Sequence, residues 1–510
     1  MANRFDFGGV NMRAEDDPHD ARPASETPFC IAVLGDFSAR GSRGIFEPKT
    51  VGERRALLID RDNFDRVMSR LKAELHLARV NTDPLVIRFS ELDDFHPDRL
   101  FEHAAFQEFK SLRKRLEDPA TFSQVAAEFG LRQPQDLVGT ETVERSARVA
   151  APSPLRLASG SLLDEMVEQT EARIALAPPR ASGSISEFAH QLAAKYAVSA
   201  PDPRQPDVIS AFDRAISHAM RAVLHHPDFQ ALESIWRAMF LLVRQVETGP
   251  QLKIYLIDVS KPELAADLGG LESLRESGIC RLLVEKASET PGADPWTIVV
   301  GGYSFGTEDT GFLSKLAKVV QQGGAIWLGG ADPSLLGCNS LAVTPNPREW
   351  NKQKDQHSWN QLRSLPEAAC VGLALPRFLL RLPYGKQTSP LEAFDFEEFA
   401  DKPSHEEYLW GNPGFALAQL LSQSFTESGW SMRPGSASQM DNLPLHTYRL
   451  NGEPESKPCA EVLLTEEAVE RILDLGLIPL ISYKGRDSVR VGRFQSIAEP
   501  QQPLRGRWNS

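Results

Sequence analysis

The sequence has no hydrophobic run long enough to cross a membrane. A membrane-spanning helix needs about 20 consecutive, mostly apolar residues, and the 510-residue chain contains no comparable run. Residues 1–6 are polar and mixed, without the apolar core of a signal peptide. We therefore expect no membrane insertion and a cytoplasmic, bacterial location.

Cysteine is scarce, and positive charge is in deficit. The five cysteines are Cys30, Cys280, Cys338, Cys370 and Cys459. They are far apart and form no CxxC pair, which argues against a zinc site or a redox-active cysteine pair. In the cytoplasm we expect reduced, mostly buried thiols. The formal net charge is −13, whereas a nonspecific nucleic-acid binder needs a basic surface. The composition therefore argues against a nucleic-acid partner.

Common catalytic signatures are also missing. There is no HExxH and no Cys/His constellation. Residues 35–44 follow an expected strand but lack the Gly-Lys-Ser/Thr ending of a phosphate loop. His225 and His226 would point about 100° apart on a helix, and no third ligand has suitable spacing. We predict no enzyme, no cofactor and no metal site.

The first part of the chain has the pattern of a small α/β unit. Residues 28–37 are an apolar run that ends in Gly-Asp, which predicts a buried strand and a turn. Further strands are expected at 57–60 and 85–89, and a helix over 98–116. That helix carries the candidate contact with the rest of the chain: Phe101, Phe106, Phe109 and Leu112.

The later part alternates strands with helices. Strands are expected at 252–259, 296–300, 325–328 and 477–482, and helices at 264–275, 312–321, 413–424 and 466–475. Such alternation predicts a parallel, helix-covered sheet. The acidic stretch 392–407 is interpreted as a solvated surface. We predict a mixed α/β fold, with the small α/β unit packed on a larger, multi-layer region that has a parallel or mixed sheet.

Composition divides the chain into five parts. Residues 131–160 are rich in Pro, Ala, Ser, Arg and Gln, which is typical of a linker. The five parts are an extended or disordered segment at 1–27, the small α/β domain at 28–130, the linker at 131–160, a helical part at 161–250 and a larger α/β domain at 251–510.

Three motifs of the first unit resemble a known family. Residues 28–38 read PFCIAVLGDFS, residues 59–65 read IDRDNFD, and residues 92–98 read LDDFHPD. In this order and spacing they are similar to the small subunit of the type VI secretion contractile sheath. The resemblance covers about 28–118.

A second set of motifs resembles the large subunit of the same sheath, over about 160–496. Residues 225–237 read HHPDFQALESIWR, and residues 375–385 read LPRFLLRLPYG. The family-motif positions are His226, Pro227, Phe229, Leu232, Trp236, Arg237, Pro376, Arg377, Arg381, Pro383, Tyr384 and Trp410. The two subunits, separate chains in the family, are expected here in one polypeptide.

Two departures from the family pattern affect what the resemblance implies. Gly302 stands where the family usually has Asp. The family's large subunit also continues beyond the segment that matches residues 494–496, and in the family that region links neighbouring protomers by strand exchange. Strand exchange of this kind uses the unpaired edge of a sheet.

The resemblance implies mechanical assembly. A fused sheath subunit would assemble around an inner tube and contract to drive secretion. Its implied partners are other sheath subunits, the inner tube protein, the baseplate and the AAA+ unfoldase that recycles contracted sheath. The alternative is a non-polymerising accessory of the same machine: a cap, an adaptor or a regulator.

A short helix expected near 162–174 has one apolar stripe, formed by Leu162, Leu163, Met166, Val167 and Thr170. Such a stripe suits docking into a partner's groove. In the family, the matching helix is recognised by the recycling unfoldase. A helix packed on its own domain is the alternative interpretation.

Overall fold

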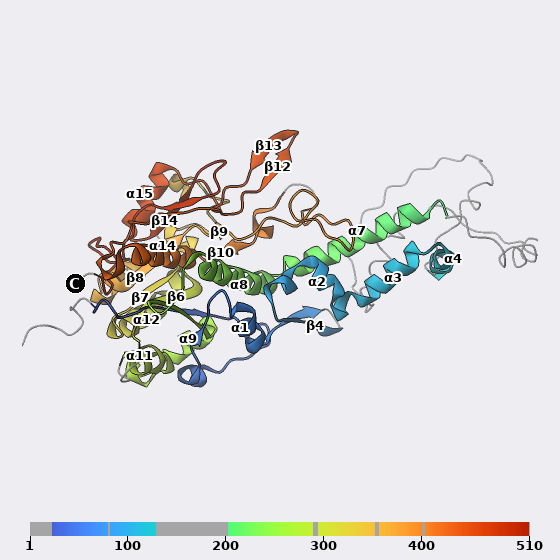
Figure 1. The fold of residues 1–510 in the computed structure, drawn as a ribbon. Helices are drawn as coiled ribbons and strands as arrows, with labels where there is room; N and C mark the ends of the chain where they lie inside the picture. Colours follow the sequence, from blue (N-terminus) through green and yellow to red (C-terminus); the bar gives the residue numbers. More distant parts are fainter. Residues whose placement is uncertain are drawn as a thin grey trace, which may run out of the picture.

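The computed structural model describes residues 23–79, 82–128, 202–288, 294–351, 356–399 and 403–508. The predicted linker at 131–160 and most of residues 1–27 lie outside the described residues. So does the predicted docking helix, with Leu162, Leu163, Met166, Val167 and Thr170. In the part that is described, a body built on a large sheet carries a helical arm (Figure 1).

Nine described strands form the central sheet. In spatial order they are β11 (Gln439–Met440), β15 (Val489–Val491), β14 (Ile478–Ser482), β8 (Val371–Leu375), β7 (Ile326–Ala331), β6 (Trp296–Phe305), β1 (Phe29–Gly35), β5 (Leu252–Asp258) and β2 (Leu57–Leu58). The strands from β14 to β5 are parallel, and β2, β15 and β11 pair antiparallel at the edges. The predicted mixed α/β class is confirmed.

β1 lies in the middle of this sheet, between β5 and β6. It pairs in parallel with β5 from Phe29–Leu252 to Gly35–Asp258, and Cys30 is opposite Trp296 of β6. All seven residues of β1 are buried. A strand that is apolar on both faces needs helices over both faces of its sheet. Residues 28–130 therefore contribute a strand to the interior of the larger region, in addition to packing on its surface; the predicted domain boundaries stay a prediction.

Helices cover both faces of the sheet (Figure 1). One face carries α8 (Pro227–Gln245) and α14 (Pro413–Ser428), which also pack on each other. The other carries α9 (Lys261–Asp267), α11 (Lys286–Ser288) and α12 (Thr310–Gln322). No helix in the described ranges is both long and apolar enough to span a bilayer.

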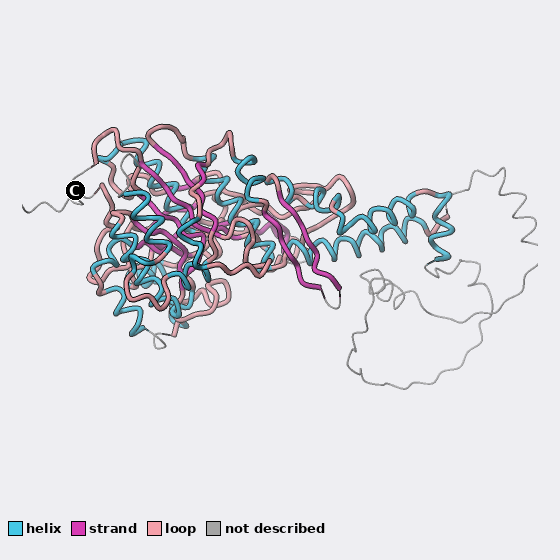
Figure 2. Tube along the Cα trace, turned by 90° about the horizontal axis from the view of Figure 1, so that it is seen from below, coloured by secondary structure: helices cyan, strands magenta, loops and turns pink. Residues whose placement is uncertain are grey.

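The helical arm is formed by α3 (Gln107–Glu117), α4 (Pro119–Glu128) and α7 (Gln205–Leu224), which extend from the body in both views (Figures 1 and 2). The helix expected over 98–116 is instead broken into α2 (Pro97–Glu102) and α3. His103 has an extended backbone that ends α2. In a continuous helix, residues 101 and 106 would point about 140° apart. Because of the break, Phe101 and Phe106 are both buried.

The remaining elements lie around the sheet. They are α1 (Phe64–Leu71), the hairpin β3 (Ala73–Arg79) with β4 (Thr82–Phe89), the pair β9 (Phe378–Leu379) with β10 (Trp410–Gly411), the hairpin β12 (Thr447–Leu450) with β13 (Glu453–Ser456), α13 (Gln356–Arg363) and α15 (Glu466–Asp474). The β12–β13 hairpin projects from the body (Figure 1). Below, residues 23–128 are called the N-terminal segment and residues 202–508 the C-terminal segment.

Candidate functional site: the contacts between the two segments

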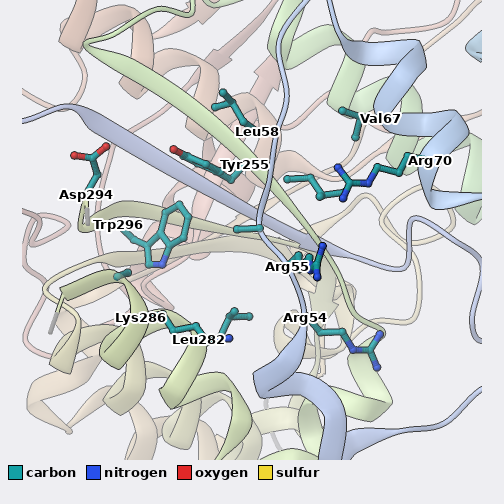
Figure 3. A pocket seen from close by; sticks show the side chains of 13 residues that line it. Arg54, Arg55, Leu58, Val67, Arg70, Tyr255, Leu282, Lys286, Asp294 and Trp296 are labelled. Carbon is teal, nitrogen blue, oxygen red and sulfur yellow. The ribbon is translucent and has the colours of Figure 1, made fainter. Parts of the chain in front are cut away.

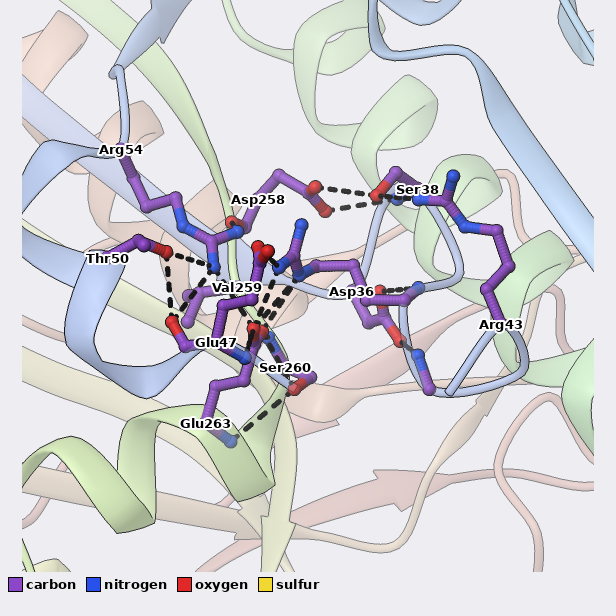
Figure 4. Close-up of polar contacts among 12 residues, drawn as sticks. Asp36, Ser38, Arg43, Glu47, Thr50, Arg54, Asp258, Val259, Ser260 and Glu263 are labelled. Atoms are coloured by element: carbon purple, nitrogen blue, oxygen red, sulfur yellow. Dashed lines mark hydrogen bonds and ion pairs between the residues drawn. The ribbon is translucent and has the colours of Figure 1, made fainter. Parts of the chain in front are cut away.

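A buried carboxylate of the C-terminal segment holds the loop that follows β1 (Figure 4). Glu263 of α9 is fully buried. It accepts hydrogen bonds from the guanidinium of Arg40, with Nε 2.9 Å from Oε2 and Nη2 2.9 Å from Oε1. Arg54 Nη2 and the backbone N–H of Glu47 donate to the same Oε1, at 3.0 and 2.9 Å. The side chain of Glu263 thus binds three residues of the N-terminal segment: Arg40, Glu47 and Arg54.

The charge on Glu263 is stabilised by these donors. Burial raises the pKa of a carboxyl group, because it disfavours the charged form. Here the hydrogen bonds from Arg40, from the N–H of Glu47 and from Ser260 outweigh burial, and the pKa of Glu263 is lowered to about 2. Removing one partner of such a buried pair leaves an uncompensated charge, at a cost of about 3–5 kcal/mol.

The first family-like motif meets the end of β5 at the carboxyl ends of β1 and β5. The hydroxyl of Ser38 and its backbone N–H donate to the carboxylate of Asp258, at 2.7 and 3.0 Å. Burial raises the pKa of Asp258 despite these bonds. Because parallel strands end at the same edge of a sheet, the turns at residues 35–38 and 258–261 are neighbours in space.

A second buried ion cluster includes two residues of α8, Glu233 and Arg237. Arg381 Nε is 2.8 Å from Oε1 of Glu233, and its Nη1 is 2.7 Å from Oε2 of Glu398. Arg237 Nε donates to the same Glu233 oxygen at 2.6 Å, and its Nη2 donates to the hydroxyl of Tyr384 at 3.0 Å. Three family-motif positions, Arg237, Arg381 and Tyr384, are therefore joined in one network.

This second cluster corrects the interpretation of the acidic stretch. Glu398 is 1% exposed, although residues 392–407 were expected to form a solvated surface. Burial raises the pKa of Glu398, but the charge of Arg381 and hydrogen bonds from Arg381 and from the backbone N–H of Tyr384 lower it to about 2. The nearby Asp395 and Glu397 are exposed as expected. Composition indicated the charge of the stretch, whereas the inward position of Glu398 depends on the fold.

The N-terminal segment also reaches this cluster. The ring of His96, the residue that caps α2, makes an edge contact with the ring of Tyr384 at 4.9 Å between centroids. Asp98 accepts hydrogen bonds from the backbone N–H groups of Glu392 and Ala393, each at 3.2 Å. The LDDFHPD motif thus contacts residues 384–393.

The motif on α8 faces the N-terminal segment. His226 caps the helix by accepting from the N–H of Asp228, and Pro227 is its first residue. Phe229 makes edge contacts with Phe89 and Phe95, whose rings stack at 4.3 Å. Leu232 and Trp236 are buried on the same helix.

The other family-motif positions lie within the C-terminal segment. The peptide bond before Pro376 is cis. Arg377 Nε donates to Oε1 of Glu461 at 2.8 Å, and its backbone N–H donates to Oε2 at 2.8 Å. Pro383 is buried. Trp410 lies on β10 and is 6% exposed, and its carbonyl oxygen accepts from Ser234 of α8 at 2.7 Å.

The four side chains predicted to join the two parts are all buried: Phe101, Phe106, Phe109 and Leu112. The ring centroid of Phe101 is 5.1 Å from that of Phe394, and that of Phe109 is 6.3 Å from that of Phe212. Phe106 lies between Phe101 and Phe109. Leu112 packs in a small cluster with Val208 and Ile209 of α7. Their importance for a working subunit stays a prediction.

Sequence reasoning missed the charged residues that connect the segments. Arg40, Glu263, Glu233 and Glu398 were not singled out. A signal for Glu263 was present, because Ser260 and Glu263 have the spacing of a capping box, which the structure forms. Glu233 likewise lies four residues before Arg237, the spacing of a helical ion pair. Neither pattern indicates a partner in a distant part of the chain.

No group of three or more His, Cys, Asp or Glu side chains in the described ranges is placed to hold a metal ion. His225 Nε2 instead lies 3.4 Å from Oε1 of Glu398. The five cysteines are buried free thiols.

Comparisons with known proteins agree with the motifs. The family described as EvpB/VC_A0108, tail sheath N-terminal domain, matches residues 206–498, more than half of the chain. The family described as Type VI secretion system, VipA, VC_A0107 or Hcp2, matches residues 8–128. The type VI secretion system sheath protein TssC1 of Pseudomonas aeruginosa is 32% identical over 304 residues. That match covers 58% of this chain and 61% of the relative.

Both predicted resemblances are confirmed, at the predicted ends of the chain and in the predicted order. The small-subunit match contains β1 to β4, and the large-subunit match contains all other strands of the central sheet. The chain therefore belongs to the tail sheath family of the type VI secretion system and carries regions of both sheath subunits in one polypeptide.

Proposed function

We propose that this protein is a structural subunit of a type VI secretion contractile sheath, in which the small and large subunits are one chain. The observation that carries the proposal is the shared sheet: β1, from the region that matches the small subunit, pairs on both sides with strands from the region that matches the large subunit. A contracting sheath has to transmit force through each subunit without separating it. Hydrogen-bonded pairing in the middle of a sheet suits that requirement better than a surface contact would.

Assembly would proceed by contacts between different faces of identical subunits. Contacts of this heterologous kind produce open helical filaments when the rotation between subunits does not close a ring. We infer that the sheath surrounds an inner tube protein, rests on a baseplate in the bacterial cytoplasm, and drives secretion by contraction. The work is mechanical and uses no catalytic chemistry.

Electron microscopy of the purified chain tests this function. Tubules, formed by the chain alone or together with cognate sheath and tube proteins, support it. Discrete particles under all of these conditions contradict it and favour the non-polymerising accessory. The variant Glu263→Gln weakens the contact between the N-terminal and C-terminal segments, so it should lower the yield of tubules. The control is Glu453→Gln, which changes an exposed glutamate of β13 and should leave the yield unchanged.

Recycling by an AAA+ unfoldase forms a separate part of the proposal. It rests on the apolar stripe of Leu162, Leu163, Met166, Val167 and Thr170. A synthetic peptide of residues 158–176 should bind the amino-terminal domain of the cognate unfoldase in a titration. The same peptide with Leu163→Asp and Val167→Asp is the control and should not bind. Equal signals from the two peptides would exclude docking through this stripe.

A further inference from the structure

The amine of Lys457 is held by one histidine and two aromatic rings. Lys457 comes directly after β13, and it is half-buried. Its Nζ lies 3.0 Å from Nδ1 of His405, 5.2 Å from the ring centroid of Tyr408 and 5.3 Å from that of Trp410. A cation in such a position is attracted by the faces of the rings. The three side chains thus fix where the amine lies.

His405 is oriented as a proton acceptor for this amine. An ammonium group only donates hydrogen bonds, so Nδ1 of His405 accepts and Nε2 carries the imidazole proton. Nε2 lies 3.2 Å from Oε1 of Glu461, and the imidazole stacks on the indole of Trp410, with 5.0 Å between centroids. The order carboxylate, imidazole, amine is that of a nucleophile, its base and the group that orients the base.

The surroundings of Lys457 act on its proton in both directions. Burial lowers the pKa of Lys457, although the charges of Glu461 and Glu406 act in the opposite direction. The attraction of the two rings for a cation also opposes loss of the proton, so a nearby base is needed to remove it. Burial raises the pKa of Glu461, but hydrogen bonds from His405 and Arg377 and the charge of Arg377 lower it to about 2. The charged Glu461 favours the imidazolium that forms when His405 takes a proton.

A cavity of about 380 Å³ lies beside this cluster. Its lining includes Arg377, Glu406, Tyr408 and Trp410. The side chain of Arg377 is 42% exposed, so its guanidinium is accessible at the surface. Guanidinium groups bind phosphate well. A small acyl donor that carries a phosphate group therefore matches the charge beside the amine.

We propose that Lys457 is a self-acylating lysine, which takes the acyl group of a small acyl phosphate with His405 as the proton acceptor. Nδ1 of His405 accepts one proton of the ammonium group. The amine then attacks the acyl carbon, and the bond from that carbon to the phosphate oxygen breaks, with its electron pair left on the phosphate. The second proton passes from the nitrogen to the released phosphate, and the third stays on the new amide.

The reaction is a single modification and not catalytic turnover, because the amide that forms on Lys457 is stable. Acylation removes the positive charge that faces the rings of Tyr408 and Trp410, directly after β13. This inference holds whether or not the protein forms a sheath.

A second lysine provides a matched control within the same molecule. Lys286 of α11 lies in an open groove of about 780 Å³ beside β2, together with Arg54 and Arg55 (Figure 3). It is exposed, and it shares the positive surroundings that attract a phosphate. Its Nζ donates to the carbonyl oxygen of Gly52 at 2.8 Å, and no histidine is among the described residues that line the groove. Lys286 thus has the attraction without the base.

Acetylation by acetyl phosphate tests the proposal in the full-length chain. Mass spectrometry of peptides follows the acetylation rate of each lysine near neutral pH. Lys457 should react at least about tenfold faster than Lys286, since a positioned general base contributes about 100-fold or more. Equal rates, or faster acetylation of Lys286, would overturn the proposal. This comparison needs no substitution.

Histidine variants separate the base from the burial of the amine. His405→Gln keeps a hydrogen-bonding side chain that cannot take a proton, so the rate at Lys457 should fall at least about tenfold while the rate at Lys286 is unchanged. His357→Gln replaces an exposed histidine of α13 and should leave both rates unchanged. An unchanged rate at Lys457 in His405→Gln, with the fold verified by circular dichroism, would show that His405 is not the proton acceptor. If His405→Gln does not fold, the two lysines of the unmodified protein still decide the matter.

Discussion

The indole nitrogen of Trp236 donates a hydrogen bond to the carbonyl oxygen of Phe37 at 2.9 Å. The two rings also make an edge contact, with 5.1 Å between centroids. Trp236 belongs to the HHPDFQALESIWR motif on α8, and Phe37 follows β1. Both side chains are fully buried. The most recognisable motif of the large-subunit region is therefore fixed directly to the turn that ends the small-subunit strand.

Replacing this indole by a phenyl ring should destabilise the protein. Trp236→Phe keeps an aromatic ring but leaves the buried carbonyl oxygen of Phe37 without this donor, at a cost of about 1–3 kcal/mol. The free energy of unfolding, measured by urea denaturation, should fall by that amount. Tyr483→Phe changes an exposed aromatic residue and should have little effect. Equal midpoints for Trp236→Phe and the unmodified protein would show that the bond does not contribute.

Neutralising Glu263 should have a larger effect. Glu263→Gln keeps the shape of the side chain but leaves Arg40 and Arg54, whose side chains are 10% and 13% exposed, without their shared carboxylate. We expect a loss of about 3–5 kcal/mol. Limited proteolysis should then cut residues 38–54 before the rest of the body. Uniform cleavage along the chain, or cleavage as slow as in Glu453→Gln, would contradict this role.

Stability should depend on pH through three buried glutamates. The pKa values of Glu263, Glu398 and Glu461 are lowered from 4.5 to about 2. The unfolded chain then binds more protons than the folded one, so stability increases with pH in this range. Their contribution is complete above about pH 4.5. It decreases as the pH falls from 4.5 to about 2.

Urea midpoints measured from neutral pH down to the acid limit check this dependence. In Glu398→Gln one of the three groups cannot titrate, so the midpoint should be lower at neutral pH and should change less between pH 4.5 and about 2. If the urea midpoint of Glu398→Gln falls as steeply with pH as that of the unmodified protein, other groups cause the acid sensitivity.

Charging the buried face of α3 should detach the arm. Phe109→Asp with Leu112→Asp places two carboxylates against Phe212, Val208 and Ile209 of α7, and a buried charge without a partner is strongly unfavourable. Hydrogen exchange should accelerate in α3, α4 and α7 and stay slow in the central sheet. Gln107→Asp with Ser111→Asp adds the same charge on the exposed side of α3 and should preserve protection. Slow exchange in the arm of both variants would contradict the prediction that the four side chains join the two parts of the chain.

Much of the fold could be predicted because its signals are local. The apolar runs at β1, β5 and β7, the proline that separates α7 from α8, and the turn at Gly476 before β14 are all written in short stretches of sequence. The break at His103 was not predicted, because residues 98–116 have a continuous apolar pattern. It depends on Phe101 meeting Phe394 while Phe109 meets Phe212.

The sequence by itself determined most of the elements, the family and the burial of β1 on both faces, because these follow from patterns of neighbouring residues. Only the tertiary structure decided that β1 lies between β5 and β6, and that Glu263 and Glu398 are inward partners of arginines. The backbone hydrogen bonds of a parallel strand fit any other parallel strand equally well. The choice of neighbours therefore depends on side chains more than 200 residues apart, such as Arg40 and Glu263, meeting in one closed interior.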